Sequence, residues 1–226
     1  MLQRVKWIRV KSELNLDELH KYFSNSVFND NDSFGFYDVE LNESTLRASY
    51  VEKELTKLEF TDPFGNVHEQ NVVSYNDFSF DFSLLEKKLY LLSIYNPPKS
   101  VRKFLDRIST NFDYLLTFSS VNLNISSLID VIQSSNAVSL FKIGRVKASG
   151  LRFSNDSTGC IELVSKGNAL NDLSENVKGE NYIIDKAKGV FLLDGERLSF
   201  ELSKSGLLST DGDESAIRFI AQAGFR

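Results

Sequence analysis

The sequence contains one cysteine, three prolines and two histidines among its 226 residues. A single cysteine, Cys160, excludes a disulfide within the chain and the cysteine-rich zinc sites. Two separate histidines, His20 and His68, are too few for a three-ligand zinc site unless carboxylates or Cys160 join them. We therefore expect neither a bound metal nor a cofactor.

Long apolar runs and an excess of positive charge are also missing. No run approaches the roughly 20 residues that cross a bilayer. Charged residues from Arg4 to Lys11 interrupt the start of the chain, where a signal peptide would be apolar. The formal net charge is −5, so the chain lacks the overall electrostatic footprint of a nucleic-acid-binding protein. We expect a cytoplasmic protein that does not enter a membrane.

The first half of the chain combines a strand, a helix and four further strands. Residues 4–10, "RVKWIRV", alternate as a strand does. Asn15 is placed to cap the helix that follows, with acidic residues in its first turn. Residues 34–95 have the pattern of an antiparallel meander, with turns at "LNES" and "DPFGN". Within this meander "FSFDF" (78–82) alternates strictly, which predicts one buried face.

Two of the three prolines are adjacent and indicate a structural seam. Pro97 and Pro98 cannot donate to a strand ladder, so the last strand of the meander should end near Asn96. Proline is favoured in the first turn of a helix, and apolar residues recur at helical spacing from Val101 to Ile108. A helix should therefore close the first half.

The same pattern then begins again. A strand at 113–119 and a helix at 124–135, capped by Asn124, follow their first-half counterparts at an offset of 109 residues. Further strands are expected between 138 and 203, including a hairpin at "LDGE", then a turn at 204–213 and a final short helix. We predict an α+β fold built from two β-α-β4-α halves, residues 1–110 and 111–226, forming one long antiparallel sheet with its helices on one face.

This order of elements resembles the saddle of the TATA-binding protein fold. In that family two such halves form one continuous curved sheet with helices on its convex side. The resemblance covers the whole chain as an order of elements, without a sequence motif of the family. It implies a platform for protein or RNA contacts. Because this chain is acidic, whereas the TATA-binding proteins carry a basic saddle, DNA bending is not expected.

Motifs for catalysis are missing. Cys160 lies next to an apolar run and is expected to be a small buried hydrophobe. The acidic residues Asp211 and Asp213 could bind Mg²⁺, which leaves a divalent-metal-dependent nuclease as one alternative, although capping of the last helix explains Asp213 better. We therefore favour a protein that is not an enzyme and assign no catalytic residue and no metal ligand.

Positive charge beside aromatic residues on an open sheet is one way to hold single-stranded nucleic acid. Six basic residues on predicted strands are candidates for binding nucleic acid or a partner: Arg47, Lys53, Lys57, Arg145, Lys147 and Arg152. The competing interpretation is a solvated sheet face whose charges keep its edges soluble. RNA or single-stranded DNA binding is thus a second alternative.

The leading functional hypothesis is a non-catalytic binding or adaptor protein. We expect it to recognise a macromolecular partner, foremost another protein or a second copy of itself, through an exposed sheet face or the polar segment 165–180. Its lysine, asparagine and serine content with scarce proline is compatible with an AT-rich bacterial or phage genome. From this composition we form the hypothesis of a role in a bacterial or phage conflict system, such as antiviral defence.

Overall fold

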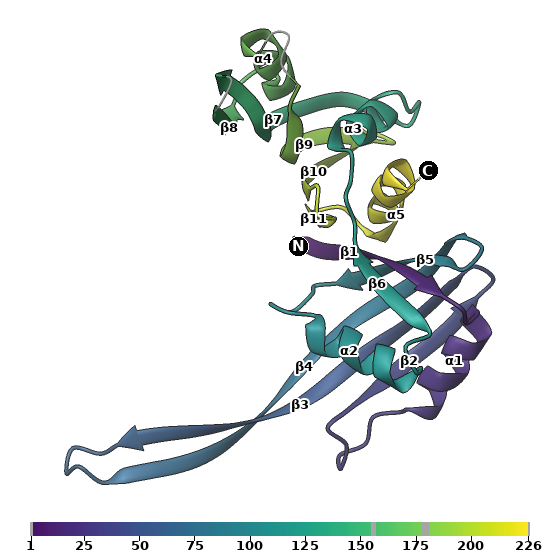
Figure 1. Cartoon of the computed structure of the whole chain (residues 1–226), viewed down its shortest axis with the longest axis vertical. Helices are drawn as coiled ribbons and strands as arrows, with labels where there is room; N and C mark the ends of the chain where they lie inside the picture. The colour runs from purple at the N-terminus through teal and green to yellow at the C-terminus, as the bar shows by residue number, and fades with distance from the viewer. Residues whose placement is uncertain (1, 155–156, 178–180, 226) are drawn as a thin grey trace. The chain divides into compact units, whose positions relative to one another are not determined.

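The computed structural model describes residues 2–154, 157–177 and 181–225, which form an α+β fold (Figure 1). The chain divides into two compact units. One runs from Arg9 to Phe118 and is called here the inserted unit; the other comprises the chain up to Ile8 and from Ser119 onward, and is called the outer unit. The α+β class is confirmed, and every strand pair with a defined register is antiparallel. Division into duplicated halves at residue 110 stays a prediction.

The inserted unit has the element order that the sequence predicts for a first half. Its elements are β1 (Gln3–Ser12, from Arg9 onward), α1 (Leu16–Asn25), β2 (Phe34–Asn42), β3 (Thr45–Thr61), β4 (Val67–Glu86), β5 (Leu89–Tyr95), α2 (Arg102–Asn111) and the start of β6 (Leu116–Ser120). The strand order is β2-β3-β4-β5-β1, and β6 also pairs with β1. The proline seam lies where it is expected, because β5 ends at Tyr95 and α2 begins at Arg102.

An aromatic core joins both helices of the inserted unit to one face of its sheet. Phe78, Phe80 and Phe82 of β4 are buried on that face, as the alternation of "FSFDF" predicts. Phe23 of α1 and Phe104 of α2 both pack on Phe80, with ring centroids 5.5 and 5.0 Å away. Each such aromatic pair adds roughly 0.5–1.5 kcal/mol beyond its buried area. Both helices therefore cover the same face of this sheet.

Strands β3 and β4 continue past the rest of the inserted unit's sheet as a two-stranded ribbon, which we call the arm, residues 53–75 (Figure 1). The register is unbroken from Lys53 opposite Tyr75 to Thr61 opposite Val67. A tight turn closes the ribbon, with Gly65 at φ 88°. Strand β2 pairs with β3 only as far as Glu52, so both outer edges of the ribbon are open in the described part of the chain.

The outer unit has more elements than the prediction for a second half. Besides the start of β1 and the end of β6, it contains α3 (Ile125–Gln133), β7 (Val138–Ser154), β8 (Ser157–Val164), α4 (Ala169–Asn176), β9 (Ile183–Leu193), β10 (Glu196–Ser203), β11 (Leu207–Thr210) and α5 (Glu214–Gly224). The strand order is β1-β11-β10-β9-β7-β8. The predicted hairpin at "LDGE" is confirmed, since Asp194 and Gly195 both have positive φ, as a type I′ turn requires.

Three details of the second-half prediction were wrong. The segment 165–180 contains helix α4, capped by Asn168, and its residues 178–180 lie outside the described residues. The segment 204–213 contains strand β11, whose four residues are too few for a clear alternation pattern. Strand β6 begins at Leu116 rather than 113, because Asp113 and Tyr114 have left-handed φ values of 47° and 61°.

One face of the outer unit's sheet is apolar and carries helices α3 and α5. The buried residues Ala187, Gly189 and Phe191 alternate along β9, and the Phe191 ring lies 6.4 Å from Phe219 of α5. A Cβ on Gly189 would lie 2.4 Å from the Lys142 carbonyl oxygen, so only glycine fits where β7 and β9 approach each other. The side chains between these residues point to the opposite face.

Asparagine and aspartate begin the helices as predicted. Asn15 accepts a hydrogen bond from the backbone N–H of Glu18 at 2.9 Å, and Glu18 completes a capping box. Asn124 and Asp213 cap α3 and α5 by accepting from the backbone N–H of Ser127 and of Ala216. None of the helices in the described residues combines the length and apolar character needed to cross a membrane.

Candidate functional site

The six predicted binding residues fall into two groups that belong to different units. Arg47, Lys53 and Lys57 lie on β3 in the inserted unit. Arg145, Lys147 and Arg152 lie on β7 in the outer unit. The charge environments of the two groups differ, and they are described in turn.

Each basic residue of the first group already has an oxygen partner. Arg47 lies 4.0 Å from the carboxylate of Asp81, and the Lys57 ammonium lies 2.7 Å from Glu69. Lys53 donates to the carbonyl oxygen of Asp30 at 3.0 Å. These contacts tie the three side chains to their own unit, so they offer little charge to a ligand.

Asp81 is a buried carboxylate on the sheet face opposite the aromatic core. Its side chain accepts a hydrogen bond from the Tyr95 hydroxyl at 2.5 Å and lies beside Ser83 and Arg47. Burial raises the pKa of Asp81, and these hydrogen bonds and the nearby guanidinium oppose that rise. Burial and the adjacent carboxylate also raise the pKa of Tyr95. The group links β3, β4 and β5, which points to a structural role.

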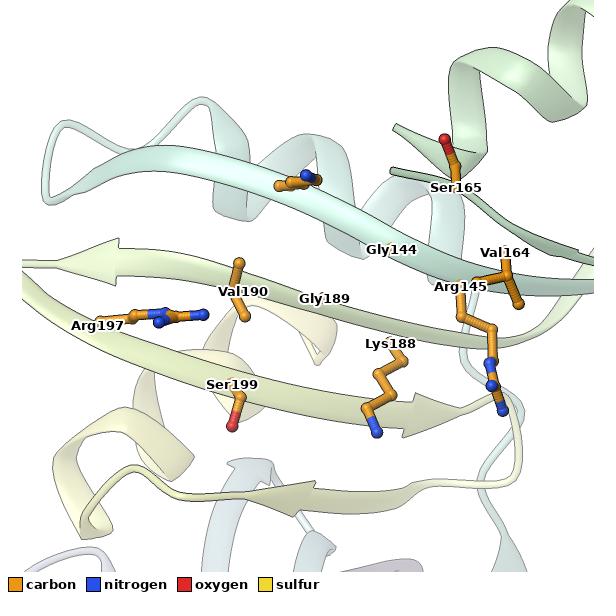
Figure 2. A pocket seen from close by; sticks show the side chains of 10 residues that line it. Gly144, Arg145, Val164, Ser165, Lys188, Gly189, Val190, Arg197 and Ser199 are labelled. Carbon is orange, nitrogen blue, oxygen red and sulfur yellow. The ribbon is translucent and has the colours of Figure 1, made fainter. Parts of the chain in front are cut away.

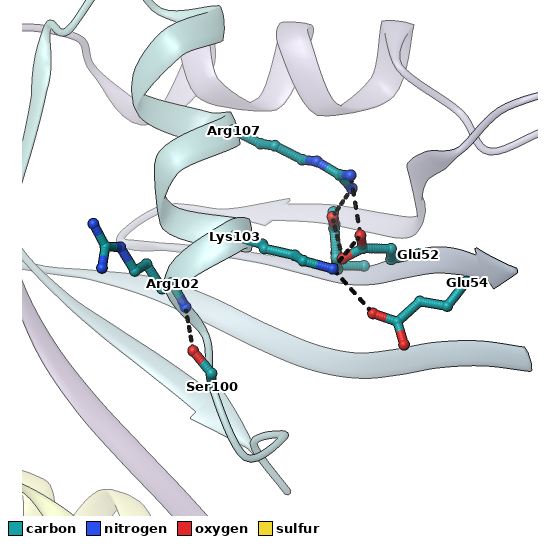
Figure 3. Close-up of polar contacts among 7 residues, drawn as sticks. Glu52, Glu54, Ser100, Arg102, Lys103 and Arg107 are labelled. Carbon is teal, nitrogen blue, oxygen red and sulfur yellow. Dashed lines mark hydrogen bonds and ion pairs between the residues drawn. The ribbon is translucent and has the colours of Figure 1, made fainter. Parts of the chain in front are cut away.

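Helix α2 is fixed to β3 by a second ionic group, shown in Figure 3. The side chain of Glu52 is only 9% exposed and lies 3.0 Å from the guanidinium of Arg107 and 3.6 Å from the ammonium of Lys103. Arg107 also donates to the Tyr50 hydroxyl at 2.6 Å and lies 4.3 Å from the centre of the Phe34 ring. Burial raises the pKa of Tyr50 to about 12 despite the nearby guanidinium, so its hydroxyl stays protonated at neutral pH.

The basic residues of the outer unit are arranged differently, because they gather on the sheet face opposite α3 and α5. We call this the open face. Its charged residues on β1, β7, β8, β9 and β10 are Arg4, Lys6, Lys142, Arg145, Lys147, Lys186, Lys188, Arg197, Glu162, Asp185 and Glu201. Eight cations therefore share this surface with three carboxylates.

The strand register places several of these residues in one row across the sheet. Arg145 of β7 is opposite Lys188 of β9, which is opposite Glu201 of β10. The row continues through Ser209 of β11 to Arg4 of β1. Residues opposite each other on one sheet face have Cβ atoms about 4.5–5.5 Å apart, so neighbours in this row interact directly.

A pocket of about 460 Å³ lies on the open face (Figure 2). Four cations line it, Lys142, Arg145, Lys188 and Arg197, and no described carboxylate does. Its remaining lining residues are small, apolar or hydroxylic: Gly144, Val164, Ser165, Gly189, Val190 and Ser199. This volume is within the range of small-molecule sites. The pocket is therefore lined by four cations together with uncharged residues.

The acidic residues near the C-terminus do not form a metal site. Asp213 caps α5, and Asp211 accepts hydrogen bonds from the backbone N–H and the hydroxyl of Ser199 at 2.7 and 2.5 Å. Within residues 2–154, 157–177 and 181–225, no three His, Cys, Asp or Glu side chains are grouped so that they could hold a metal ion. Cys160 was expected to be buried, but it is exposed on β8 opposite Ser149.

The arm exposes apolar side chains to solvent on both of its faces. They have exposed fractions from 46% to 90%: Leu55, Leu58, Phe60, Phe64, Val67, Val73 and Tyr75. Phe64, at the tip, is the most exposed of them, and Phe60 stacks on His68 with 5.3 Å between ring centroids. Scattered exposed apolar residues are ordinary, but a contiguous group marks an interaction surface.

The sequence prediction missed most cations of the open face. It identified Arg145 and Lys147 on β7 but not Lys186 and Lys188, because it did not pair β9 with β7. The available signal was the stretch "DKAKGV", in which lysines alternate with small residues. Such alternation indicates a strand with one charged face and one closely packed face.

Compared with known proteins, the chain matches no family model and no curated protein sequence. The interpretation of both surfaces therefore depends on their residues and geometry alone.

Proposed function

We propose that this protein is a non-catalytic binding protein that recognises another protein through the arm. The observation that carries this proposal is the set of seven large apolar side chains exposed along residues 53–75. An isolated two-stranded ribbon is only marginally stable in water. A partner that covers these side chains would stabilise the arm and remove apolar surface from solvent.

The charges on the arm favour a protein partner over nucleic acid. The arm carries two lysines, Lys53 and Lys57, and four acidic residues, Glu54, Glu59, Asp62 and Glu69. A ribbon that enters a nucleic-acid groove needs cations to meet the phosphates. A surface that is apolar and slightly acidic instead complements an apolar protein surface with basic residues at its rim.

The open edges of the arm offer a second mode of contact to the same partner. Beyond Glu52, no described strand pairs with the outer edge of β3. Unpaired backbone groups on such an edge can accept a strand from another chain. The arm thus supports binding through its side chains and its backbone together.

A shortened arm tests this proposal. Removing residues 55–73 and joining Glu54 to Ser74 through Asn-Gly preserves the register, since Glu54 and Ser74 are opposite each other. The ion pair between Glu54 and Lys103 stays available to the shortened chain. We expect it to remain folded, with far-UV circular dichroism of a folded α+β chain, and to lose its partner.

The partner is identified by photo-cross-linking in the native cells. A cross-linking amino acid at Phe64, at the tip, is compared with one at Leu84, which is exposed on β4 outside the arm. Enrichment of one protein at Phe64 supports the proposal, and a cross-link between two copies would identify the partner as the chain itself. Equal products at both positions, or retention of the partner by the shortened arm, would contradict it.

We further propose that the two parts of the chain derive from a duplicated β-α-β4-α unit with a saddle-like sheet. In support, α1 and α3 each follow a strand and are each capped by asparagine at an offset of 109 residues. Helix α4 and strand β11 would be later additions to the second copy. Superposition of residues 1–110 on 111–226 in an experimental structure tests this, and failure of β1-α1 to align with β6-α3 would contradict it.

A further inference from the structure

Cations lie directly opposite one another in the middle of the open face. Arg145 is paired with Lys188, and the adjacent Lys147 is paired with Lys186. Like charges at opposed positions destabilise a sheet. Glu162 lies 3.6 Å from Arg145, and Glu201 forms an ion pair with Lys186. In the described part of the chain Lys147 and Lys188 make no ion pair. Glu162 and Glu201 lie opposite them on the outer strands and Asp185 lies near Lys147, so three carboxylates offset part of the charge of these four cations.

The pocket extends this positive surface along the same strands. Lys142 and Arg197 are among its lining residues, and Lys142 also donates to the carbonyl oxygen of Lys166 at 2.5 Å. Val164 and Val190 supply apolar lining between the cations. Asp211 contacts Ser199 and reduces the positive potential at that end, but it does not line the pocket. Cations thus outnumber carboxylates across the pocket and the neighbouring rows.

We propose that the open face binds the phosphate backbone of single-stranded nucleic acid, with one nucleotide unit seated in the pocket. Bound phosphates would lie between the opposed cations and turn their repulsion into attraction. This surface shares no residue with the arm, so the inference stands whether or not the arm binds a protein.

The form of the face favours a single strand over a duplex. Bases of a single strand are free to leave the stack, and one nucleotide can enter a pocket of about 460 Å³. A duplex keeps its bases paired inside the double helix, so it would contact only the charged surface around the pocket. No aromatic residue lines the pocket among the residues that the structure describes, so recognition should depend on the backbone and tolerate different base sequences.

Several cations spaced along two rows also favour a polymer over an acidic peptide. Phosphodiesters carry one charge at every unit, which matches cations repeated on adjacent strands at about 4.8 Å. Acidic side chains on a peptide are attached through flexible stems and lose more rotamer freedom on binding. Nucleic acid is therefore the occupant to which the inference commits.

A binding titration tests the inference with fluorescent oligo(dT) and oligo(U) of about 15 nucleotides, on the full chain, at several salt concentrations. The test variant is Lys188→Gln with Arg197→Gln. The matched control is Lys53→Gln with Lys57→Gln, which makes the same change in net charge on the arm. Poly-glutamate, a duplex of the same length and a single nucleotide serve as competing ligands.

We expect both oligonucleotides to bind with salt-dependent affinity. Each phosphate contact contributes about 0.7 to the slope of log affinity against log salt, so the test variant should lose about 1.4 of that slope. Its affinity at about 50 mM salt should fall at least tenfold, while the control stays within about twofold of the wild type.

Four results would overturn the inference. The first two are an absence of oligonucleotide binding at low salt and an equal loss of oligonucleotide affinity in the test and control variants. The other two are tighter binding of poly-glutamate or of the duplex than of the single strand, and binding of the single nucleotide as tightly as the oligonucleotide. Retained folding of each variant is checked by circular dichroism, so a loss of binding cannot be confused with unfolding.

Discussion

Basic residues have different surroundings in the two units. In the inserted unit, Arg47, Lys57 and Arg107 each lie within 4.0 Å of a carboxylate on a neighbouring element. On the open face of the outer unit, Arg145 and Lys186 have carboxylate partners, but Lys147 and Lys188 make no ion pair with any described residue. Each of these two lysines lies between a cation on one neighbouring strand and a carboxylate on the other. The cations of the first unit are therefore bound to carboxylates, whereas Lys147 and Lys188 keep charge available to a ligand.

This difference shows why a count of cations along a strand is a poor guide to binding. Arg47 and Arg145 look alike in the sequence, because each lies on a long alternating strand near aromatic or apolar residues. Only strand pairing reveals that Arg47 lies beside a buried carboxylate, whereas Arg145 is opposite Lys188 and 3.6 Å from the exposed carboxylate of Glu162. The neighbours that decide the role are distant in sequence.

The strongest test of this contrast is Arg107→Ala. It leaves the buried carboxylate of Glu52 without its nearest cation and removes the donor to Tyr50. We expect the free energy of unfolding, measured by urea denaturation, to fall by about 2 kcal/mol.

Lys103→Ala is the matched control, because Lys103 contacts the same carboxylate from a side chain that is 68% exposed. Its effect should be about 0–1 kcal/mol. Equal losses of unfolding free energy in the two variants would show that Arg107 stabilises the buried Glu52 carboxylate no more than the exposed Lys103 does.

A second test uses the pH dependence of stability. Burial raises the pKa of Asp81 in the folded chain, so as pH rises from about 4 the unfolded chain releases this proton first. The contribution of Asp81 to stability is therefore fully present below the unfolded pKa and decreases as pH rises through the folded pKa.

Asp81→Asn removes this titration. It should therefore reduce the fall in the free energy of unfolding with pH, measured by urea denaturation between about pH 3.5 and 7. Asp106→Asn, at an exposed position on α2, is the control. Identical pH profiles for wild type and Asp81→Asn would contradict the raised pKa.

The smallest expected effect on stability is that of Lys188→Gln with Arg197→Gln. Neither side chain makes an ion pair or hydrogen bond with a residue that the structure describes, so the free energy of unfolding should stay within about 0.5 kcal/mol of the wild type. Relief of repulsion should also make the variant less sensitive to added salt. A loss of stability above about 1 kcal/mol would assign these cations a structural role.

Most elements of the fold could be predicted from local patterns. Caps at Asn15, Asn124 and Asp213 and the alternation of 78–82 depend on neighbours within a few residues. Strand β11 was missed because its burial depends on strands β1 and β10, which are distant in sequence. Helix α4 was missed because it is short and polar and buries only Ala169 and Leu173.

The two proposed binding surfaces were harder to predict. The strands of the arm were expected, but their departure from the sheet was not. In retrospect, residues 53–75 mix charged and apolar side chains on both faces, which a strand with one buried face would not do. The open face could not be assembled because register across five strands is set by turns, bulges and packing rather than by any one strand's composition.

The pairing of strand β1 has a consequence for folding of the chain during its synthesis on the ribosome. Residues 3–6 pair with residues 207–210, so this part of β1 is synthesised about 200 residues before its partner strand. At ~5–20 residues per second that delay is roughly 10–40 s, whereas Arg9–Phe118 is complete at about half the chain. The outer unit is therefore the last to close, and a truncated product lacking β11 would keep a bare β edge at its N-terminus, open to misassembly.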